Sequence, residues 1–512
     1  MDRGTPQART LQIRIRRESE TPLYRQIADS VRNTIENNSL EDGDRLPPMR
    51  ELAARLGINR NTVSLAYREL ERIGLVQSDV GRGTFVRRRR LPKSGIAGAP
   101  VEEGPIEWSR VVARRSVGRG EVLERLSVGD GVNRIELTGA VADRDLFPVD
   151  AFRDVLEEVV REMGPSVLDY GSREGYLPLR KWLAERLTGQ GTSVSENDVF
   201  ILNGAQPGLD LVAKLLIEEG DAVVVESPTY YNAIGAFRLY GAEMAGIPVD
   251  GEGIPPDALE EVLVRRPVKL LYCMPTFQNP TGASMGRARR EAVLSLARRH
   301  GVAVLDDTFD ADLRYRGKEE TSLRGLPGGE DVLLLGTFSK ILFPGLRLGW
   351  LVAPAALHEG IGRIRRSTDL AAGLLAQAAI HRFCEKGLLD RHIEKVRGVN
   401  RRRLRVLLDS MAEHFPPEAA WTEPEGGMSL WVTLPRRVDT VEVLLEARRL
   451  GVNFTPGPLF HADGGGGNAF RLSFTLEKEE RIAEGIRVLG GILREKCAER
   501  RSAPDDAPSV FL

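Results

Sequence analysis

The N-terminal 90 residues carry the hydrophobic spacing of short amphipathic helices. After Thr21 and Pro22, which suit a helix cap and first turn, apolar residues recur at every fourth position. They are Leu23, Ile27, Val31 and Ile35. Similar spacing predicts a short helix from Met49 to Leu56, ended by Gly57, and a third helix over residues 59–73. The tight glycine turn between the last two predicts a helix-turn-helix.

The third predicted helix has an apolar and a polar face. Its apolar residues are Val63, Ala66, Tyr67, Leu70 and Ile73, and its polar ones are Arg60, Asn61, Ser64 and Arg68. A helix that begins with polar and basic residues can enter the major groove of DNA. Residues 75–86 then read as two short strands around Gly81-Arg82-Gly83, a hairpin whose glycines allow close approach to a groove.

This block resembles the winged helix-turn-helix of the GntR family. The shared motifs are Leu46-Pro-Pro-Met-Arg50 and Gly81-Arg-Gly-Thr-Phe-Val86. The resemblance implies that a double-stranded DNA operator is contacted by Arg50, Arg60, Thr62 and Gly83. For any single arginine the alternative is a solvated helix residue. Residues 11–90 hold sixteen Arg, no Lys and eleven Asp and Glu, a net +5 in a chain of net −1, which suits a polyanionic partner.

A chain of 512 residues needs more than one hydrophobic core. We expect a tail over 1–20, the DNA-binding domain over 21–87 and a flexible linker over 88–120, which is rich in Pro, Gly and small residues. The arginine run 87–90 either adds phosphate contacts or keeps the linker solvated. A larger domain over 121–497 follows, with a small subdomain from about 385, and then a tail over 498–512.

The larger domain alternates helical patterns with short apolar runs. These runs are 199–202, 222–225, 269–272, 302–305 and 332–335. Apolar strands separated by helices predict an α/β domain with a mostly parallel sheet, in which ligands bind beyond the carboxyl ends of the strands. The polar residues singled out below follow such runs.

Lys340 is the most informative of these residues. It lies in the stretch 336–350 after the last run, between Thr337 and Ser339 on one side and Arg347 on the other. A lysine there can form a Schiff base with an aldehyde, while the hydroxyls and the guanidinium hold a phosphate. The alternative is a surface lysine in a Gly-Pro loop.

Other candidates follow the remaining runs. Gly204, Ala205 and Gln206 begin a predicted helix, whose backbone N–H groups can bind a phosphate. Tyr230 can stack on a ring, and Asn279 precedes Pro280, which favours extended backbone. Asp306 and Asp307 end a strand, and one of them can hold a pyridine nitrogen protonated. Alignment of Asp312-Leu-Arg-Tyr315 with the family that these segments resemble favours Asp307 and leaves Asp306 as the alternative.

These segments together resemble fold-type I aminotransferases, which bind pyridoxal 5'-phosphate. The resemblance implies that Lys340 carries the cofactor, that Asn279 bonds its phenolic oxygen, and that Arg471 clamps a substrate carboxylate. It also implies a homodimer in which Tyr170 reaches the phosphate of the neighbouring subunit. Two departures each remove a hydroxyl: Phe309 replaces a usual tyrosine, and Ala205 replaces a usual Ser or Thr.

The DNA-binding domain, which we call the head, and the larger domain, which we call the body, together resemble the MocR/GabR-type regulators. The resemblance implies a transcription regulator that senses an amino acid or amine by forming an external aldimine. A working aminotransferase with a DNA-binding domain is the first alternative, and a body that only dimerises is the second. No apolar run is long enough to span a membrane, and no metal site is expected. The three cysteines, Cys273, Cys384 and Cys497, are widely spaced, which fits a reducing cytoplasm.

Overall fold

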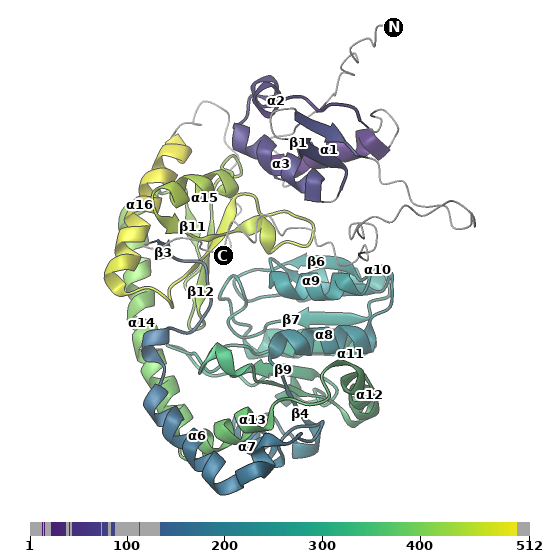
Figure 1. The fold of residues 1–512 in the computed structure, drawn as a ribbon, viewed down its shortest axis with the longest axis vertical. Coiled ribbons are helices and arrows are strands. Elements are labelled where there is room, and N and C mark those ends of the chain that lie inside the picture. Colours follow the sequence, from purple (N-terminus) through teal and green to yellow (C-terminus); the bar gives the residue numbers. More distant parts are fainter. Residues whose placement is uncertain are drawn as a thin grey trace, which may run out of the picture. The chain divides into compact units, whose positions relative to one another are not determined.

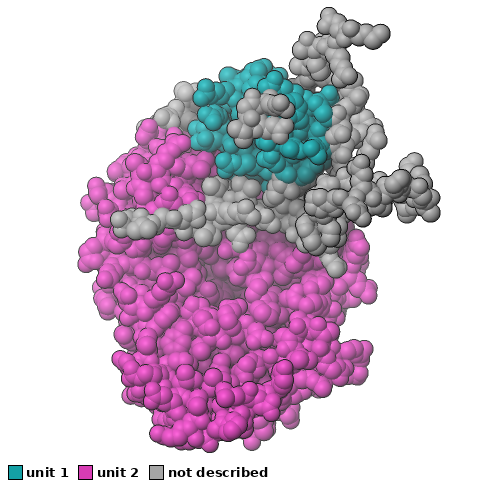
Figure 2. Space-filling view, viewed as in Figure 1, with its two compact units in different colours: residues 1–126 teal, residues 127–512 magenta. Residues whose placement is uncertain are grey.

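The computed structural model describes residues 13, 15, 22–36, 40, 43–72, 74–79, 83–87, 112 and 134–498. The chain forms two compact units, residues 1–126 and 127–512 (Figure 2). Thr21, Gly81, Arg82 and the arginine run from 88 lie outside the described residues. Within the described ranges, no helix is both long and apolar enough to cross a bilayer.

The first unit is a winged helix-turn-helix. Its helices are α1 (Leu23–Glu36), α2 (Met49–Leu56) and α3 (Arg60–Arg72), and its strands are β1 (Val76–Asp79) and β2 (Gly83–Val86). Gly57 ends α2 with φ +62°, a left-handed conformation that glycine adopts at little cost. The strands pair antiparallel, with Val76 opposite Val86. The apolar faces predicted for these helices are buried, because the side chains of Ile27, Val31 and Leu70 are 0% exposed.

The segment before α2 joins the wing to α3. The Leu46 N–H donates to the Thr84 carbonyl at 2.8 Å, and the Val86 N–H donates to the Asp44 carbonyl at 2.8 Å. Arg45 forms a β-bridge with Phe85. From the other side, the Tyr67 hydroxyl of α3 donates to the Pro47 carbonyl at 2.8 Å. The segment is therefore held by both DNA-reading elements.

The second unit is built on a seven-stranded sheet of order β4-β10-β9-β8-β7-β5-β6 (Figure 1). Its strands are β4 (Val199–Leu202), β5 (Ala222–Ser227), β6 (Glu243–Pro248), β7 (Leu270–Cys273), β8 (Ala303–Asp307), β9 (Leu333–Thr337) and β10 (Gly349–Val352). Strand β10 runs antiparallel to both neighbours, and the other pairings are parallel. The predicted mostly parallel sheet is confirmed.

Helices cover both faces of this sheet. One face packs against α8 (Ala205–Leu216), α9 (Tyr231–Leu239) and α12 (His358–Thr368), and its core includes Leu305 and Tyr272. The opposite face packs against α10 (Pro256–Arg265) and α11 (Arg287–Arg299), and its core includes Val304 and Cys273. Successive residues of a strand therefore point into different cores, and this alternation decides which strand-end side chains can meet.

The remaining elements form a smaller layer and its connections. A four-stranded antiparallel sheet has the order β11-β12-β15-β14, and β13 pairs parallel with β3. The strands are β3 (Ile135–Glu136), β11 (Ala420–Trp421), β12 (Ser429–Thr433), β13 (Val452–Asn453), β14 (Thr455–Pro456) and β15 (Ala469–Ser473). The helices are α6 (Val149–Met163), α7 (Leu177–Gly189), α13 (Leu374–Glu385), α14 (Leu388–His414), α15 (Thr440–Arg449) and α16 (Glu479–Ala498). Strand β15 carries Arg471 into the site described next.

Candidate functional site

Lys340 lies just beyond the carboxyl end of β9, close to where β8 ends and α8 begins. Its amine donates a hydrogen bond to the Ala140 carbonyl at 2.5 Å. Burial, together with the positive charges of Arg471 and Arg347, lowers the pKa of Lys340 to about 8. The carboxylates of Asp310 and Asp307 oppose this shift. A lysine with a lowered pKa holds more of the neutral amine, which is the nucleophilic form.

Asp307 shares this side of the sheet, whereas Asp306 does not. Burial raises the pKa of Asp307 to about 7, and the Tyr272 hydroxyl donates to its Oδ2 at 2.9 Å. Its Oδ1 has no hydrogen-bond partner among the described residues. Asp306 points to the opposite core, where its Oδ2 accepts from the Leu323 N–H at 2.8 Å. The geometry thus favours Asp307 as the carboxylate that can serve a ligand at Lys340.

The start of α8 and the side chain of Arg347 form a candidate anion site. Gly204 precedes α8 with φ +115°, and no side chain caps this helix. A Cβ built on Gly204 would lie 3.0 Å from Nη2 of Arg347, so the guanidinium rests against this glycine. A Cβ on Gly349 would lie 3.1 Å from the Ala205 nitrogen, so glycine lets β10 approach the helix start closely. Free N–H groups beside a guanidinium suit a phosphate.

The other residues predicted for this anion site lie at the same place. Thr337 Oγ1 is 3.0 Å from Ser339 Oγ and 3.1 Å from the Leu348 carbonyl. Gln206, in the first turn of α8, donates to the Asn232 carbonyl at 3.3 Å, and its Oε1 has no partner among the described residues. Ala205 contributes only its backbone, because its side chain has no hydroxyl.

The side chains of Arg471 and Asn279 are hydrogen-bonded to each other. Arg471 is 4% exposed and donates from Nη1 to Asn279 Oδ1 at 2.9 Å. Its Nη2 donates to the Thr138 carbonyl, and its guanidinium lies 5.0 Å from the centre of the Phe460 ring. Burial lowers the pKa of Arg471. Such a desolvated cation favours an anionic partner. The Asn279–Pro280 peptide bond is cis.

Tyr230 and Phe309 complete the wall near Asp307. The Tyr230 hydroxyl accepts from Asn232 Nδ2 at 2.9 Å, and burial raises its pKa. The charges of Asp307 and Arg471 also act on Tyr230, Asp307 raising its pKa and Arg471 lowering it. Phe309 packs partly buried against the core that contains Leu305. The structure thus brings together every residue predicted for the cofactor except Tyr170.

Residues 138–141, which we call the crossing segment, also belong to this site. Four successive carbonyls of the segment accept side-chain hydrogen bonds. The pairs are Arg471 to Thr138, Ser473 to Gly139 at 2.8 Å, Lys340 to Ala140 at 2.5 Å, and Thr475 to Val141 at 2.7 Å. Sequence reasoning missed this segment because backbone carbonyls are the same in every residue.

Asp310 is a second residue that sequence reasoning missed. It is 2% exposed, and its Oδ1 has no hydrogen-bond partner among the described residues. Burial raises the pKa of Asp310 well above its usual range, and the nearby charge of Lys340 acts in the opposite direction. The sequence signal for Asp310 was its position three residues after Asp307. That signal is weak, because exposed aspartates are common in such loops.

The remaining predicted residues lie elsewhere. Tyr170 is 85% exposed, and its side chain makes no hydrogen bond with the site residues described above. Arg50 and Arg60 are exposed on the first unit. Gly83 begins β2 with φ +120°. Thr62 is 3% exposed, so its side chain is not presented on the surface as those of the two arginines are.

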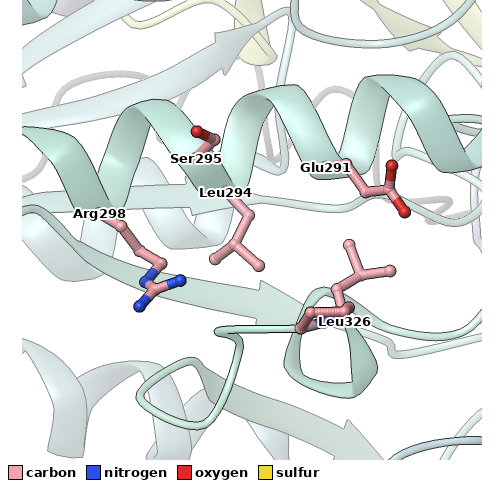
Figure 3. Close-up of a pocket in the computed structure, with 6 residues that line it drawn as sticks. Glu291, Leu294, Ser295, Arg298 and Leu326 are labelled. Atoms are coloured by element: carbon pink, nitrogen blue, oxygen red, sulfur yellow. The ribbon is translucent and has the colours of Figure 1, made fainter.

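A separate hollow lies between α11 and the loop that carries Leu326 (Figure 3). It is lined by Glu291, Leu294, Ser295, Arg298, Leu326 and Pro327. Glu291 is paired with Arg287 at 2.8 Å. None of the residues predicted for the cofactor lines this hollow.

The donor set at Lys340 fits pyridoxal 5'-phosphate. The lysine amine matches an aldehyde, the α8 start with Arg347 matches a phosphate, and the partnerless Oδ1 of Asp307 matches a protonated ring nitrogen. Arg471 lies on the side of Asn279, where it can receive a carboxylate from a ligand that also reaches Lys340.

Comparison with known proteins supports the same two-part division. Residues 143–489 match the family described as aminotransferase class I and II, and residues 23–86 match bacterial regulatory proteins, gntR family. The chain is 34% identical over 407 residues to aromatic-amino-acid aminotransferase 1 of Thermococcus litoralis, covering 77% of this chain and 97% of that protein. It is 29% identical over 451 residues to the probable rhizopine catabolism regulatory protein MocR of Rhizobium meliloti, covering 86% and 87%.

A solved structure gives the same result for the body. Kynurenine aminotransferase of Pyrococcus horikoshii, in complex with PMP, superimposes with a TM-score of 0.73 at 35% identity, covering 76% of this chain and 98% of that chain. The 451-residue match to MocR is longer than the aminotransferase segment 143–489, so the likeness to that regulator extends beyond the body. The chain therefore belongs to the aminotransferase class I and II family, and it joins that domain to an N-terminal DNA-binding domain of the GntR family of bacterial regulatory proteins.

Proposed function

We propose that the protein is a transcription regulator that binds pyridoxal 5'-phosphate and changes its DNA binding when the body takes up an amino acid or amine. The observation that carries this proposal is the complete lysine site, Lys340 with Asp307 and Arg347, in a chain that begins with a GntR-type head. A DNA partner supports a cytoplasmic location.

Each side chain of the site has a distinct task. The cofactor, when bound, supplies an aldehyde that condenses with amines and a ring that accepts electrons. Lys340 provides the amine that holds it, and its lowered pKa keeps that amine partly neutral. Asp307 would accept a hydrogen bond from the ring nitrogen and so keep that nitrogen protonated, and the α8 start with Arg347 would hold the phosphate. Arg471 holds the carboxylate of an amino acid, so that ligand and Lys340 compete for one position.

The crossing segment supplies a route from ligand to head. Residues 138–141 follow the linker in the chain, and they accept hydrogen bonds from both Lys340 and Arg471. A ligand that binds these two side chains changes the hydrogen bonds that they donate to the carbonyls of the segment. A ligand shifts an equilibrium only through different affinities for the two states. We therefore assign the signal to a rearrangement of this segment.

We further propose a homodimer. Tyr170 is 85% exposed and carries an aromatic ring and hydroxyl that its own site does not use. Such a residue is explained if it completes the phosphate site of a second subunit, as the resemblance to fold-type I aminotransferases implies. Two heads on linkers would then bind two half-sites, whose spacing the linkers leave adaptable.

Transamination is a second candidate function. It is favoured by the intact set of Lys340, Asp307, Asn279 and Arg471. If the protein is a transaminase, the missing hydroxyl at Phe309 weakens the binding of the cofactor's phenolic oxygen and slows turnover. Chromatography of the keto acid formed from an amino acid and 2-oxoglutarate distinguishes an enzyme from a sensor that binds without turnover.

Footprinting tests the proposal directly. The purified full chain is incubated with duplex DNA from the region flanking its own gene, with and without pyridoxal phosphate and a panel of amino acids and amines. We expect a protected site whose extent or affinity changes with one class of ligand. Absence of any protected site at low salt would overturn the assignment as a DNA-binding regulator.

A further inference from the structure

Arg45 is an exposed arginine beside the wing strand β2. It belongs to the segment that pairs with this strand, and its neighbour Leu46 is only 2% exposed. Because successive residues of an extended segment point to opposite sides, the inward Leu46 places the side chain of Arg45 on the outer side. The Tyr67 bond to Pro47 fixes the same segment to α3.

The guanidinium of Arg45 lies against Gly83. A Cβ built on Gly83 would lie 2.7 Å from Nε and 3.1 Å from Nη2 of Arg45. A side chain at position 83 would therefore displace the guanidinium, and φ +120° is already unfavourable for any residue other than glycine. Glycine at this position leaves the arginine lying along the backbone of the wing strand.

Nothing in the described part of the chain neutralises this arginine. Its guanidinium makes no ion pair and no side-chain hydrogen bond with a described residue, and the side chain is exposed. Arg32 of α1 is different, because it pairs with Asp29. A positioned guanidinium with no counter-charge among the described residues, next to Gly83 at the turn end of the hairpin, can bind an anion.

We propose that Arg45 binds a backbone phosphate of DNA next to the wing and so positions α3 over its site. This inference rests on the proposed DNA-binding function. Phosphate is the expected target because Arg45 lies along a strand rather than on the helix that enters the groove, and contacts of this kind set register without reading bases. Its guanidinium can bind the phosphate through two N–H groups.

The test compares Arg45→Ala with Arg32→Ala in the full chain loaded with pyridoxal phosphate. Both variants remove one positive charge from the same domain, but Arg32 is paired within α1. Fluorescence anisotropy gives the Kd on duplex DNA flanking the gene and on a scrambled duplex of equal length and composition, over a salt series. Circular dichroism melting confirms that both variants fold.

We expect Arg45→Ala to weaken binding several-fold on both duplexes and to reduce the slope of log Kd against log salt by about 1 for each bound head. Arg32→Ala should leave the slope unchanged, and Arg45→Lys should recover part of the affinity. An unchanged slope in Arg45→Ala overturns the phosphate contact. A loss confined to the flanking duplex would make Arg45 a base-reading residue instead and also overturns it. If wild type itself bound neither duplex, the proposed function would fail first.

Discussion

At the scale of single residues, the site depends on competition between burial and charge at Lys340. Burial and the guanidinium of Arg471 lower its pKa, and two carboxylates raise it, with a result of about 8. Sequence motifs predicted the lysine and its partners Asp307, Asn279 and Arg471. They could not predict Asp310 or the Ala140 carbonyl, because burial and backbone direction are set by the tertiary fold.

The lowered pKa gives a pH dependence for cofactor loading. Only the neutral amine of Lys340 condenses with an aldehyde, so the loading rate should rise as pH passes through about 8 and then level off. Stopped-flow absorbance of the cofactor-free protein mixed with pyridoxal phosphate measures this rate. Lys340→Ala should show no lysine adduct at any pH. A rate that still climbs beyond pH 10, as for an ordinary lysine, would contradict the shift.

The two adjacent aspartates give a matched pair of variants. Asp307→Asn should weaken cofactor binding about 10- to 100-fold, because hydrogen bonds to charged groups contribute about 1.5–3 kcal/mol. Asp306→Asn should change it little, since its carboxylate faces Leu323 in the opposite core. Titration of the visible absorbance measures both affinities. The reverse ranking would assign the ring nitrogen to Asp306.

At the scale of elements, sequence patterns found five strands of the large sheet and missed β6 and β10. The five predicted apolar runs became β4, β5, β7, β8 and β9. Strand β6 was missed because it lies at the sheet edge and mixes Glu243, Gly246 and Pro248 with apolar residues. Strand β10 was missed because it begins inside the glycine-rich stretch after Lys340. Strand β15, which carries Arg471, is buried at all five residues.

Helix α3 carries a prediction about DNA recognition. Arg60 is the first residue of α3 and is exposed, as a groove-reading side chain must be. Arg60→Ala should weaken binding to the operator by roughly 1–3 kcal/mol if it contacts a base. The same variant should bind a scrambled duplex nearly as well as wild type. Equal losses on both duplexes would make Arg60 a phosphate contact.

At the scale of the whole molecule, the site is assembled from segments far apart in the chain. Ala140 meets Lys340 across 200 positions, and Thr138 meets Arg471 across 333. Local patterns carry no information on such pairings, so the sequence could predict the separate motifs but not the crossing segment that joins them. The family resemblance supplied the order of the motifs, and the fold supplied their contacts.

A dimer is the first prediction at this scale. Sedimentation equilibrium at micromolar concentration should give twice the mass of one chain. Tyr170→Phe should leave this mass unchanged, because it removes only a hydroxyl from an exposed side chain, and should weaken cofactor binding. If Tyr170→Phe bound the cofactor as tightly as wild type, Tyr170 would not complete the site of a second subunit. If the protein were a monomer with bound cofactor, the proposed dimer would be wrong.

Effector response is the second prediction, and Arg471→Gln tests it. The variant keeps a hydrogen-bond donor near the Thr138 carbonyl but removes the charge that binds a carboxylate. DNA binding without effector should be unchanged, because Arg471 lies in the body and the head reads the DNA. The concentration of amino acid needed for a response should rise about 10- to 100-fold, since charged hydrogen bonds contribute about 1.5–3 kcal/mol. The decarboxylated amine of the same amino acid serves as the control ligand, and it should act equally on wild type and variant. A reporter response to the amino acid that survives in Arg471→Gln would show that the effector's carboxylate is bound elsewhere.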